Sequence, residues 1–573
     1  MKKIIFLILI VLLCISSLAL ISCGGEDDTT TTAEPLNKPT FEIVDLQSTR
    51  TTVSFEITET DPDNAGEIKS IELYQNGVKV KTAESIDARK FSNLTQNTKY
   101  TVNVTYSYDL QNGEGEKTDS VSIDVSTTNE GFSSKTNVKK DWEGKTLNVA
   151  CTTWSSAAGA PWSVVELCVE DGKESGFGTK IDAAVLERQE FIKSTYGVNV
   201  NWINCGQYDF GNELNKAEIA GNVSYDIALP RALRVQRIVA NGLVYDIGNR
   251  DYIDFSNPYY NKDSVDTYTA MGHTFFVDGD FSTLSKEVAK VLYFNKKFLG
   301  GEKATAELYQ KVREGKWTWD QLVALGTSVY KDDGDGKHSE NDMYGLDKLA
   351  LYSMPYSFGV KTVGIDKSTG EWKLSLKDSE IYKIVAKLHL TEDLNWLRPT
   401  WNSSTWGENG AVKALKNETL LFLRENVRLS SYEKLEGIGV VPFPMLNEEQ
   451  GRYCVPLDDR YPFLMCIPKS TQDRFMSDYF VDVLSWTGSE YTMKAYLEQK
   501  AEAFESDADI EMLVNCIFPS IIHNAGVEGW NNVLSVNINN GIEEFDKSYN
   551  KEEPEALETI KEWNKAWGSY TEN

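Results

Sequence analysis

The stretch KIDAAVLERQEFIKSTYGVNVNWINC, residues 180–205, passes from a helix pattern into a strand pattern and decides the fold class of most of the chain. Residues 180–196 place apolar side chains at helical spacing, and Gly197 ends the segment, as glycine often does just beyond a helix. Residues 198–205 then have the pattern of a strand. A helix followed directly by a strand indicates an α/β unit.

The segments around this stretch repeat the same alternation. Strand patterns occur in TLNVAC (146–151) and SYDIALP (224–230), and helix patterns in NELNKAEIAGN (212–222) and RALRVQRIVANG (231–242). Strands that alternate with helices predict a parallel sheet with right-handed crossovers. Because ligands of such sheets bind beyond the carboxyl ends of the strands, the residues that follow these ends are candidate contacts: Trp154, Trp162, Tyr208 and Arg231.

A second group of strand patterns lies in the later part of the chain. KEVAKVLYFNKK (286–297) predicts a strand that runs into a helix, and TLLFL (419–423), GIGVV (437–441) and FLMCIP (463–468) follow among helix patterns. Two separated groups of strands predict two α/β lobes rather than one sheet. Thr318 and Gln321 have the spacing of a capping box. Four tryptophans in helix patterns are expected to serve packing: Trp317, Trp319, Trp486 and Trp563.

The N-terminus has the features of an export segment. Lys2 and Lys3 precede an apolar run, and residues 20–23, Leu-Ile-Ser-Cys, resemble a bacterial lipoprotein cleavage box. We expect residues 1–22 to be a lipoprotein signal peptide and Cys23 to carry the lipid that holds the protein at an extracytoplasmic membrane surface. An uncleaved membrane anchor is the alternative, because the apolar run approaches spanning length.

Residues 23–39 are polar and rich in threonine, which predicts a flexible tether. Short segments between residues 40 and 128 alternate apolar and polar side chains, with turn residues between them, and predict an all-β sandwich. The stretch FSNLTQNTKYTVNVTYSY (91–108) resembles the fibronectin type III family, with Leu94 and Tyr100 at the positions of its tyrosine corner. This resemblance implies a spacer or adhesion module without chemistry. Residues 129–144 would be a linker to the α/β part, residues 145–573.

Composition excludes several classes of partner and site. The net charge of −28 repels phosphate backbones, so nucleic acid is not an expected partner. Outside the export segment, cysteines stand at 151, 168, 205, 454, 466 and 516 without a CxxC pair, which argues against zinc ribbons and thioredoxin-type chemistry. Disulfides are permitted outside the cytoplasm, but free buried thiols are the preferred interpretation. None of the 4 histidines has the spacing of a metal site.

Several stretches, taken in order, resemble an extracellular solute-binding protein of an ABC importer, of the family 1 type that binds oligosaccharides. They are YGVNVNW, AEIAGNVSYDIAL with ANGLVYDI, VLYFNKKFL, EGKWTWDQLVALG, MYGL, and GIGVVPFPM with YCVPLDDRYPFLMCIP. The resemblance covers roughly residues 145–573. It implies a two-lobed α/β periplasmic-binding-protein fold of type II, a ligand cleft closed by a hinge, and delivery to a permease. It implies no enzymatic activity and no required cofactor.

A sugar offers apolar ring faces to aromatic side chains and hydroxyl groups to charged and amide side chains. In the second lobe, side chains of these types occur in segments that we expect to be loops: Tyr356, Trp401, Trp406, Arg424, Asp459 and Arg460. Asp280 in VDGDFS is a further candidate, with turn formation as its alternative. For each loop aromatic, core packing remains the competing explanation.

The stretch YKDDGDGKHSENDMYG, residues 330–345, resembles a calcium loop. With Gly336 at the sixth position of an EF-hand register, the candidate ligands are Asp333, Asp335, the Lys337 carbonyl and Asp342. The first position falls on Lys331, a cation, so the ligand set is defective. A structural calcium ion and a bare Asp/Gly turn both remain open.

Two other functions compete with solute binding. A surface-anchored glycoside hydrolase would need two carboxylates across a cleft, and the abundance of acidic residues cannot identify such a pair. The succession of elements also does not match a (β/α)8 barrel. An adhesion or scaffold lipoprotein would use the β-sandwich as its active part.

Overall fold

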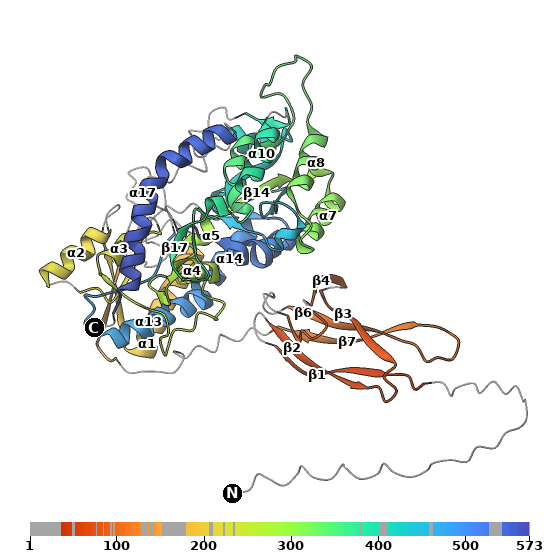
Figure 1. Ribbon diagram of the computed structural model, residues 1–573, viewed down its shortest axis with the longest axis horizontal. Coiled ribbons are helices and arrows are strands. Elements are labelled where there is room, and N and C mark those ends of the chain that lie inside the picture. The colour runs from red at the N-terminus through yellow and green to blue at the C-terminus, as the bar shows by residue number, and fades with distance from the viewer. Residues whose placement is uncertain are drawn as a thin grey trace, which may run out of the picture.

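The computed structural model describes residues 36–48, 52–75, 77–83, 85–91, 94, 98–127, 136, 142–151, 179–205, 210–221, 224–232, 235–378, 380–392, 395–399, 410–457, 462–525 and 541–571 (Figure 1). The predicted signal peptide and Cys23 lie outside these residues. Within the described ranges, no helix combines the length and the apolar character needed to cross a membrane.

Strands β1–β7 form the all-β unit that the alternating pattern predicts. One antiparallel sheet contains β1 (Thr40–Ser48), β2 (Val53–Thr60) and β5 (Lys90–Phe91). The other has the order β4-β3-β6-β7, formed by Val78–Thr82, Gly66–Gln75, Lys99–Tyr108 and Lys117–Ser126. Phe55, Leu73 and Val102 bury their side chains in one core between the sheets, together with Leu94 and Tyr100.

The first α/β sheet has the predicted parallel arrangement. Strands β8 (Thr146–Cys151), β9 (Asn199–Asn204) and β10 (Ile227–Leu229) have the order β10-β8-β9, and both pairings are parallel. Helices α1 (Thr179–Tyr196), α2 (Phe210–Ala220) and α3 (Val235–Ala240) occupy the predicted helix segments. Leu147, Val149 and Leu229 are fully buried, so apolar burial fixes the register of this sheet.

The second sheet is mixed and has the order β18-β15-β19-β14-β20. Its strands are β14 (Lys290–Asn295), β15 (Tyr344–Asp347), β18 (Leu397–Arg398), β19 (Leu420–Asn426) and β20 (Ile438–Val441). Strand β15 runs parallel to both β18 and β19, whereas β14 is antiparallel to β19 and β20. The predictions for residues 419–423 and 437–441 are therefore confirmed, as is the prediction of two strand groups.

Helices α6 (Lys296–Leu299), α7 (Glu302–Arg313), α8 (Trp319–Val329), α10 (Ile381–Glu392) and α11 (Gly410–Lys416) belong to the second sheet's part of the chain. Thr318 is the N-cap of α8, but the predicted capping box is wrong, because the Thr318 side chain makes no capping hydrogen bond. The backbone N–H of Trp319 donates instead to the Met445 carbonyl, and Gln321 Oε1 accepts from Lys311 Nζ, both at 2.7 Å. The four tryptophans predicted to pack are all buried.

Two antiparallel segments connect the sheets. Residues 277–289 lead from the region of the first sheet into β14. Val277 forms an antiparallel bridge with Met465, and Ala289 forms one with Leu457, so the returning chain lies beside this segment at both points. Cys466 pairs with Ala228 of β10. The predicted strand FLMCIP is regular only at β22 (Ile467–Pro468), which pairs with β11 (Val244–Tyr245), because its earlier residues make isolated bridges.

Three further elements complete this framework. Strands β21 (Val455–Pro456) and β23 (Ile521–Ile522) pair in parallel beside the connecting segments. The long helix α17 (Ile542–Gly568) contacts α3, α10 and β17 (Trp372–Leu374), and so lies against parts of both groups of elements (Figure 1). Helix α13 (Arg474–Thr487) packs near β22.

Candidate functional site

The carboxyl ends of the three parallel strands in the first sheet lie at one edge. Leu229, Cys151 and Asn204, the last residues of β10, β8 and β9, are direct register partners. The chain that leaves β8 contains Trp154 and Trp162, and the chain that leaves β9 contains Tyr208. These three candidates lie outside the described residues, so their participation stays a prediction.

Arg231 follows β10 and is the described candidate at this edge. It forms a bridge with Phe463 of the returning segment, and its guanidinium carbon lies 5.1 Å from the centroid of the Phe463 ring. The residue is 9% exposed. A guanidinium over an aromatic face is held by electrostatic attraction, so Arg231 is fixed where the first sheet meets the connecting segments.

The second sheet has a comparable edge. Strands β18, β15 and β19 are parallel to one another through β15, so their carboxyl ends face the same way. Arg398 ends β18, Asp347 ends β15, and the two residues are register partners. Arg424 lies near the end of β19. Burial raises the pKa of Asp347 to about 6, although the nearby guanidinium groups of Arg398 and Arg424 act in the opposite direction.

The structure corrects the predicted placement of two candidates in this lobe. Arg424 lies in a strand rather than a loop, and Tyr356 lies in the one-turn helix α9 (Met354–Ser357), partly buried against the core. Arg424 was expected in a loop because the predicted strand ended at residue 423, whereas β19 continues to Asn426. The other candidates of this lobe lie outside the described residues: Trp401, Trp406, Asp459 and Arg460. Sequence reasoning missed Asp347 and Arg398, although the carboxyl-end rule would have found them in the short strands YGLD and LR.

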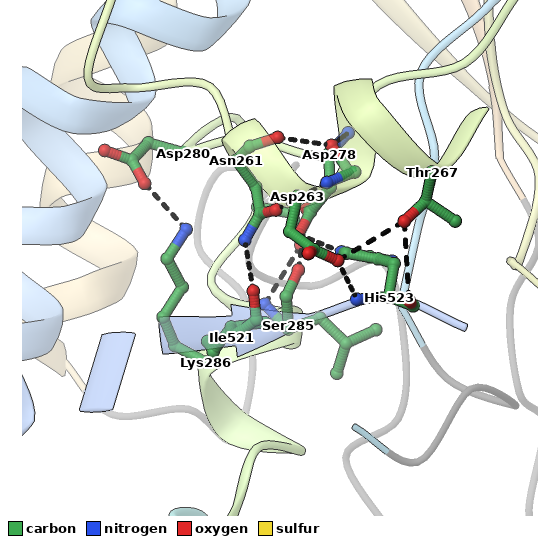
Figure 2. Close-up of polar contacts among 12 residues, drawn as sticks. Asn261, Asp263, Thr267, Asp278, Asp280, Ser285, Lys286, Ile521 and His523 are labelled. Carbon is green, nitrogen blue, oxygen red and sulfur yellow. Dashed lines mark hydrogen bonds and ion pairs between the residues drawn. The ribbon is translucent and has the colours of Figure 1, made fainter. Parts of the chain in front are cut away.

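A buried polar network lies beside the connecting segments (Figure 2). Asp278 Oδ2 is 3.0 Å from Nε2 of His523, and its Oδ1 accepts a hydrogen bond from Ser285 at 2.7 Å. Burial alone would raise the pKa of Asp278, but the hydrogen bond and the charge of His523 hold it below its usual range. This network joins the segment that enters β14 to the chain that follows β23.

Asp263 extends the network. Its Oδ2 accepts from the His523 backbone N–H at 2.8 Å and from Lys361 Nζ at 2.9 Å. Burial would raise the pKa of Asp263, and the Lys361 ammonium keeps it below its usual value. Asp280, one of the ligand candidates, pairs with Lys286 Nζ at 2.7 Å (Figure 2). The Lys286 ammonium therefore offsets part of the charge of Asp280 within the protein. The sequence alone had left two roles open for Asp280, ligand contact and turn formation.

The aspartate loop groups three carboxylates. One oxygen of each of Asp332, Asp333 and Asp335 lies within 4.8 Å of the others. The group shares two residues with the predicted calcium ligands, adds Asp332, and leaves out Lys337. Asp342 is buried, and its carboxylate accepts hydrogen bonds from the backbone N–H groups of Asp333 and Ser339 in the same loop, each at 3.0 Å.

The described cysteines are free thiols, as predicted: Cys151, Cys205, Cys454, Cys466 and Cys516. Burial raises the pKa of Cys516 to about 12, and it also raises the pKa values of Cys454 and Cys466. Such thiols are poor nucleophiles, so these three cysteines serve packing.

Comparison with solved structures finds similar chains. An ABC substrate-binding protein from Listeria monocytogenes, in complex with cycloalternan, is 15% identical, with a TM-score of 0.38 over 74% of this chain and 99% of that chain. A cyclo/maltodextrin-binding protein complexed with maltotetraose is 13% identical, with a TM-score of 0.45 over 75% and 100%. A family 1 extracellular solute-binding protein from Bifidobacterium longum subsp. infantis is 12% identical, with a TM-score of 0.42 over 74% and 100%.

All three are binding proteins, and two are described as substrate- or solute-binding proteins, the family that the sequence resembles. No protein-family model matches the chain, and no curated protein matches it.

Proposed function

We propose that this protein is a membrane-anchored, extracytoplasmic solute-binding protein that captures a carbohydrate, chiefly an oligosaccharide, and delivers it to an ABC transporter permease. One observation carries the proposal. Two separate α/β sheets present charged residues at the carboxyl ends of parallel strands, and two antiparallel segments connect the sheets. Carboxyl ends of parallel strands are where α/β folds bind ligands.

The residues at these edges suit a polyhydroxylated ligand. The guanidinium of Arg231 can donate hydrogen bonds to hydroxyl groups, and the carboxylate of Asp347 can accept them. The loop tryptophans Trp154 and Trp401 would add ring stacking. The two connecting segments can act as a hinge, since a few residues absorb the rotation when two lobes close on a ligand.

The proposal is tested with the purified full-length chain after removal of the signal peptide. A thermal-shift screen against plant and host oligosaccharides should find a ligand that raises the melting temperature, because saturation at 100 times Kd adds about 2.7 kcal/mol of stability. Native mass spectrometry should then show the intact saccharide bound. Hydrolysis of the ligand would favour the glycoside hydrolase instead, and attachment to cells or polysaccharide without any small ligand would favour adhesion.

Anchoring through Cys23 is a separate part of the proposal. The two sheets of residues 40–126 would then form a fibronectin type III-like spacer between the membrane and the binding lobes. Cys23→Ser should release the protein into the medium, with Cys516→Ser as a control that removes a buried thiol and leaves the anchor. A Cys23→Ser protein that stays in the membrane fraction would refute lipidation at this site.

A further inference from the structure

The charged edge of the second sheet contains the guanidinium groups of Arg398 and Arg424, whose hydrogen bonding is incomplete within the described residues. Arg398 is 4% exposed, and its side chain makes no hydrogen bond or ion pair with any residue that the structure describes. Nε of Arg424 is completely buried and also has no hydrogen-bond partner there. Most buried polar groups in proteins are hydrogen-bonded, and buried charges are normally paired. The buried Arg398 side chain and Nε of the half-buried Arg424 are therefore exceptions within the described part of the chain.

The carboxylates nearby do not balance this charge. Asp347 is 2% exposed and lies near both guanidinium groups, but it forms no ion pair with either within the described residues. Glu425 is the next acidic group. Its carboxylate interacts with the charge of Arg424 and, less strongly, with that of Lys290, and it accepts a hydrogen bond from the Asn426 N–H at 3.2 Å. The guanidinium groups of Arg398 and Arg424 and the Lys290 ammonium therefore share the carboxylates of Asp347 and Glu425, so positive charge remains in excess at this edge.

The guanidinium of Arg398 lies close to the start of α11. A Cβ atom added at Gly410, the first residue of α11, would lie 3.3 Å from Nη2 of Arg398. The side chain thus reaches from the end of β18 to the start of α11, across the edge where the strands end. A guanidinium in this setting prefers a planar or tetrahedral oxyanion, which accepts two parallel N–H donors from its fork.

We propose that Arg398 and Arg424 bind an anionic substituent of the captured saccharide, a carboxylate or a sulfate ester, so that the transported solute is an acidic oligosaccharide. This inference rests on the proposed function and names its substrate class. A neutral hydroxyl could accept a hydrogen bond, but it would leave the excess positive charge at this edge uncompensated. The net charge of −28 does not oppose such a ligand at contact distance, because exposed charges are screened beyond about 8 Å at physiological ionic strength.

Matched ligand pairs test the proposal and separate the two sources of the anion. Trigalacturonate is compared with its fully methyl-esterified form, and a sulfated galactan tetrasaccharide with its desulfated form, by isothermal titration calorimetry. We expect the charged member of one pair to bind at least about tenfold more tightly than its uncharged partner, since hydrogen bonds to charged groups are the stronger ones. The pair that shows the difference identifies carboxylate or sulfate as the group recognised.

Variants locate the effect. Arg398→Gln and Arg424→Gln should each weaken binding of the charged member by about 10- to 100-fold and leave the uncharged member unchanged. Arg89→Gln removes one positive charge from the β-sandwich and serves as the matched control. Arg398→Lys keeps the positive charge but loses the parallel N–H donors of the guanidinium, so it should give an intermediate affinity. It also provides a second variant at this position if Arg398→Gln does not fold.

The outcomes distinguish this inference from the proposed function. Tighter binding of the uncharged members, or equal weakening of both members in the variants, overturns the acidic class and leaves carbohydrate capture standing. If neither these pairs nor the wider panel of neutral oligosaccharides binds, carbohydrate capture itself fails and the inference fails with it.

Discussion

Nε2 of His523 lies 3.0 Å from Oδ2 of Asp278, and each side chain is only 1% exposed. Asp278 belongs to the segment that leads into β14, whereas His523 follows β23, which pairs with β21. The pair therefore joins two stretches of chain that are far apart in sequence and meet where the two sheets are connected. Its strength bears directly on the stability of that connection.

Asp278→Asn should destabilise the protein by about 2–4 kcal/mol, because it removes the charge that His523 and Ser285 contact in a buried site. The folded-state pKa of Asp278 is depressed, so its stabilisation is present above the unfolded pKa, near 4, and is lost as the pH falls through the folded value. Urea unfolding at pH 7 and at pH 3.5 measures both effects. Asp320→Asn, on an exposed helix surface, is the control, and equal stability of the two variants at pH 7 would contradict the prediction.

Asp347 gives a pH dependence of the opposite sign. Its pKa is about 6 in the folded protein, above the unfolded value, so its contribution to stability is complete below about pH 4 and is lost as the pH rises through 6. The loss is on the order of 2–3 kcal/mol, and Asp347→Asn should abolish it. Thermal melting from pH 4 to pH 7.5 measures this term. Asp366→Asn, in an exposed turn, should leave the loss between pH 5 and pH 7 unchanged.

The same substitution affects the proposed anionic ligand. Removing the Asp347 carboxylate takes away a negative charge that opposes both guanidinium groups, so Asp347→Asn should tighten binding of the charged saccharide several-fold. The wild-type protein should approach that affinity as the pH falls from 7 to 5, where Asp347 becomes protonated. Weaker binding in Asp347→Asn would assign the carboxylate a direct role in holding the ligand.

Glu287 and Lys500 form a fully buried ion pair between α5 (Leu284–Glu287) and α14 (Met493–Ala503). Ser431 Oγ also donates to both Glu287 oxygens, at 3.0 and 2.9 Å. Lys500→Met should cost about 3 kcal/mol because it leaves a buried carboxylate without its cation. The double variant with Glu287→Gln should cost less than the sum of the single changes. A double-mutant cycle by urea unfolding measures this coupling, and additive costs would contradict it.

We propose that the aspartate loop accepts a calcium ion through Asp332, Asp333 and Asp335, since hard cations take carboxylate oxygens and each residue offers one to the group. Millimolar calcium should then raise the melting temperature, and Asp335→Ala should abolish the rise. Asp366→Ala alters an aspartate turn outside this group and should retain it. If calcium does not shift the wild-type melting temperature, the loop is an Asp/Gly turn fastened by Asp342.

The alternation of short strand and helix patterns was sufficient to predict the parallel sheet of β8, β9 and β10, because local patterns and burial agree there. The prediction of a strand at FLMCIP was only partly correct, because residues 463–466 pair with two different partners, β10 and the segment around Val277. Partner choice in this region depends on contacts between residues that are far apart in the chain, such as Val277 with Met465 and Ala228 with Cys466. A local pattern cannot encode such contacts.

The candidate site shows the same limit. Arg231 was found because it follows an obvious strand, and Arg424 because it is charged and close to a strand end. Asp347 and Arg398 were missed because β15 and β18 are too short for their periodicity to mark them as strands. His523 was missed because its partner, Asp278, lies 245 residues away in the chain.

Helix α17 has a consequence for how distant parts of the sequence depend on one another. Trp567 packs against Phe275 and Trp372, and Asn564 Nδ2 donates to the Trp372 carbonyl, so α17 covers aromatic surfaces of elements from much earlier in the sequence. A change that displaced this helix would expose those rings to water, so damage at α17 would be felt in elements that lie far from it along the chain.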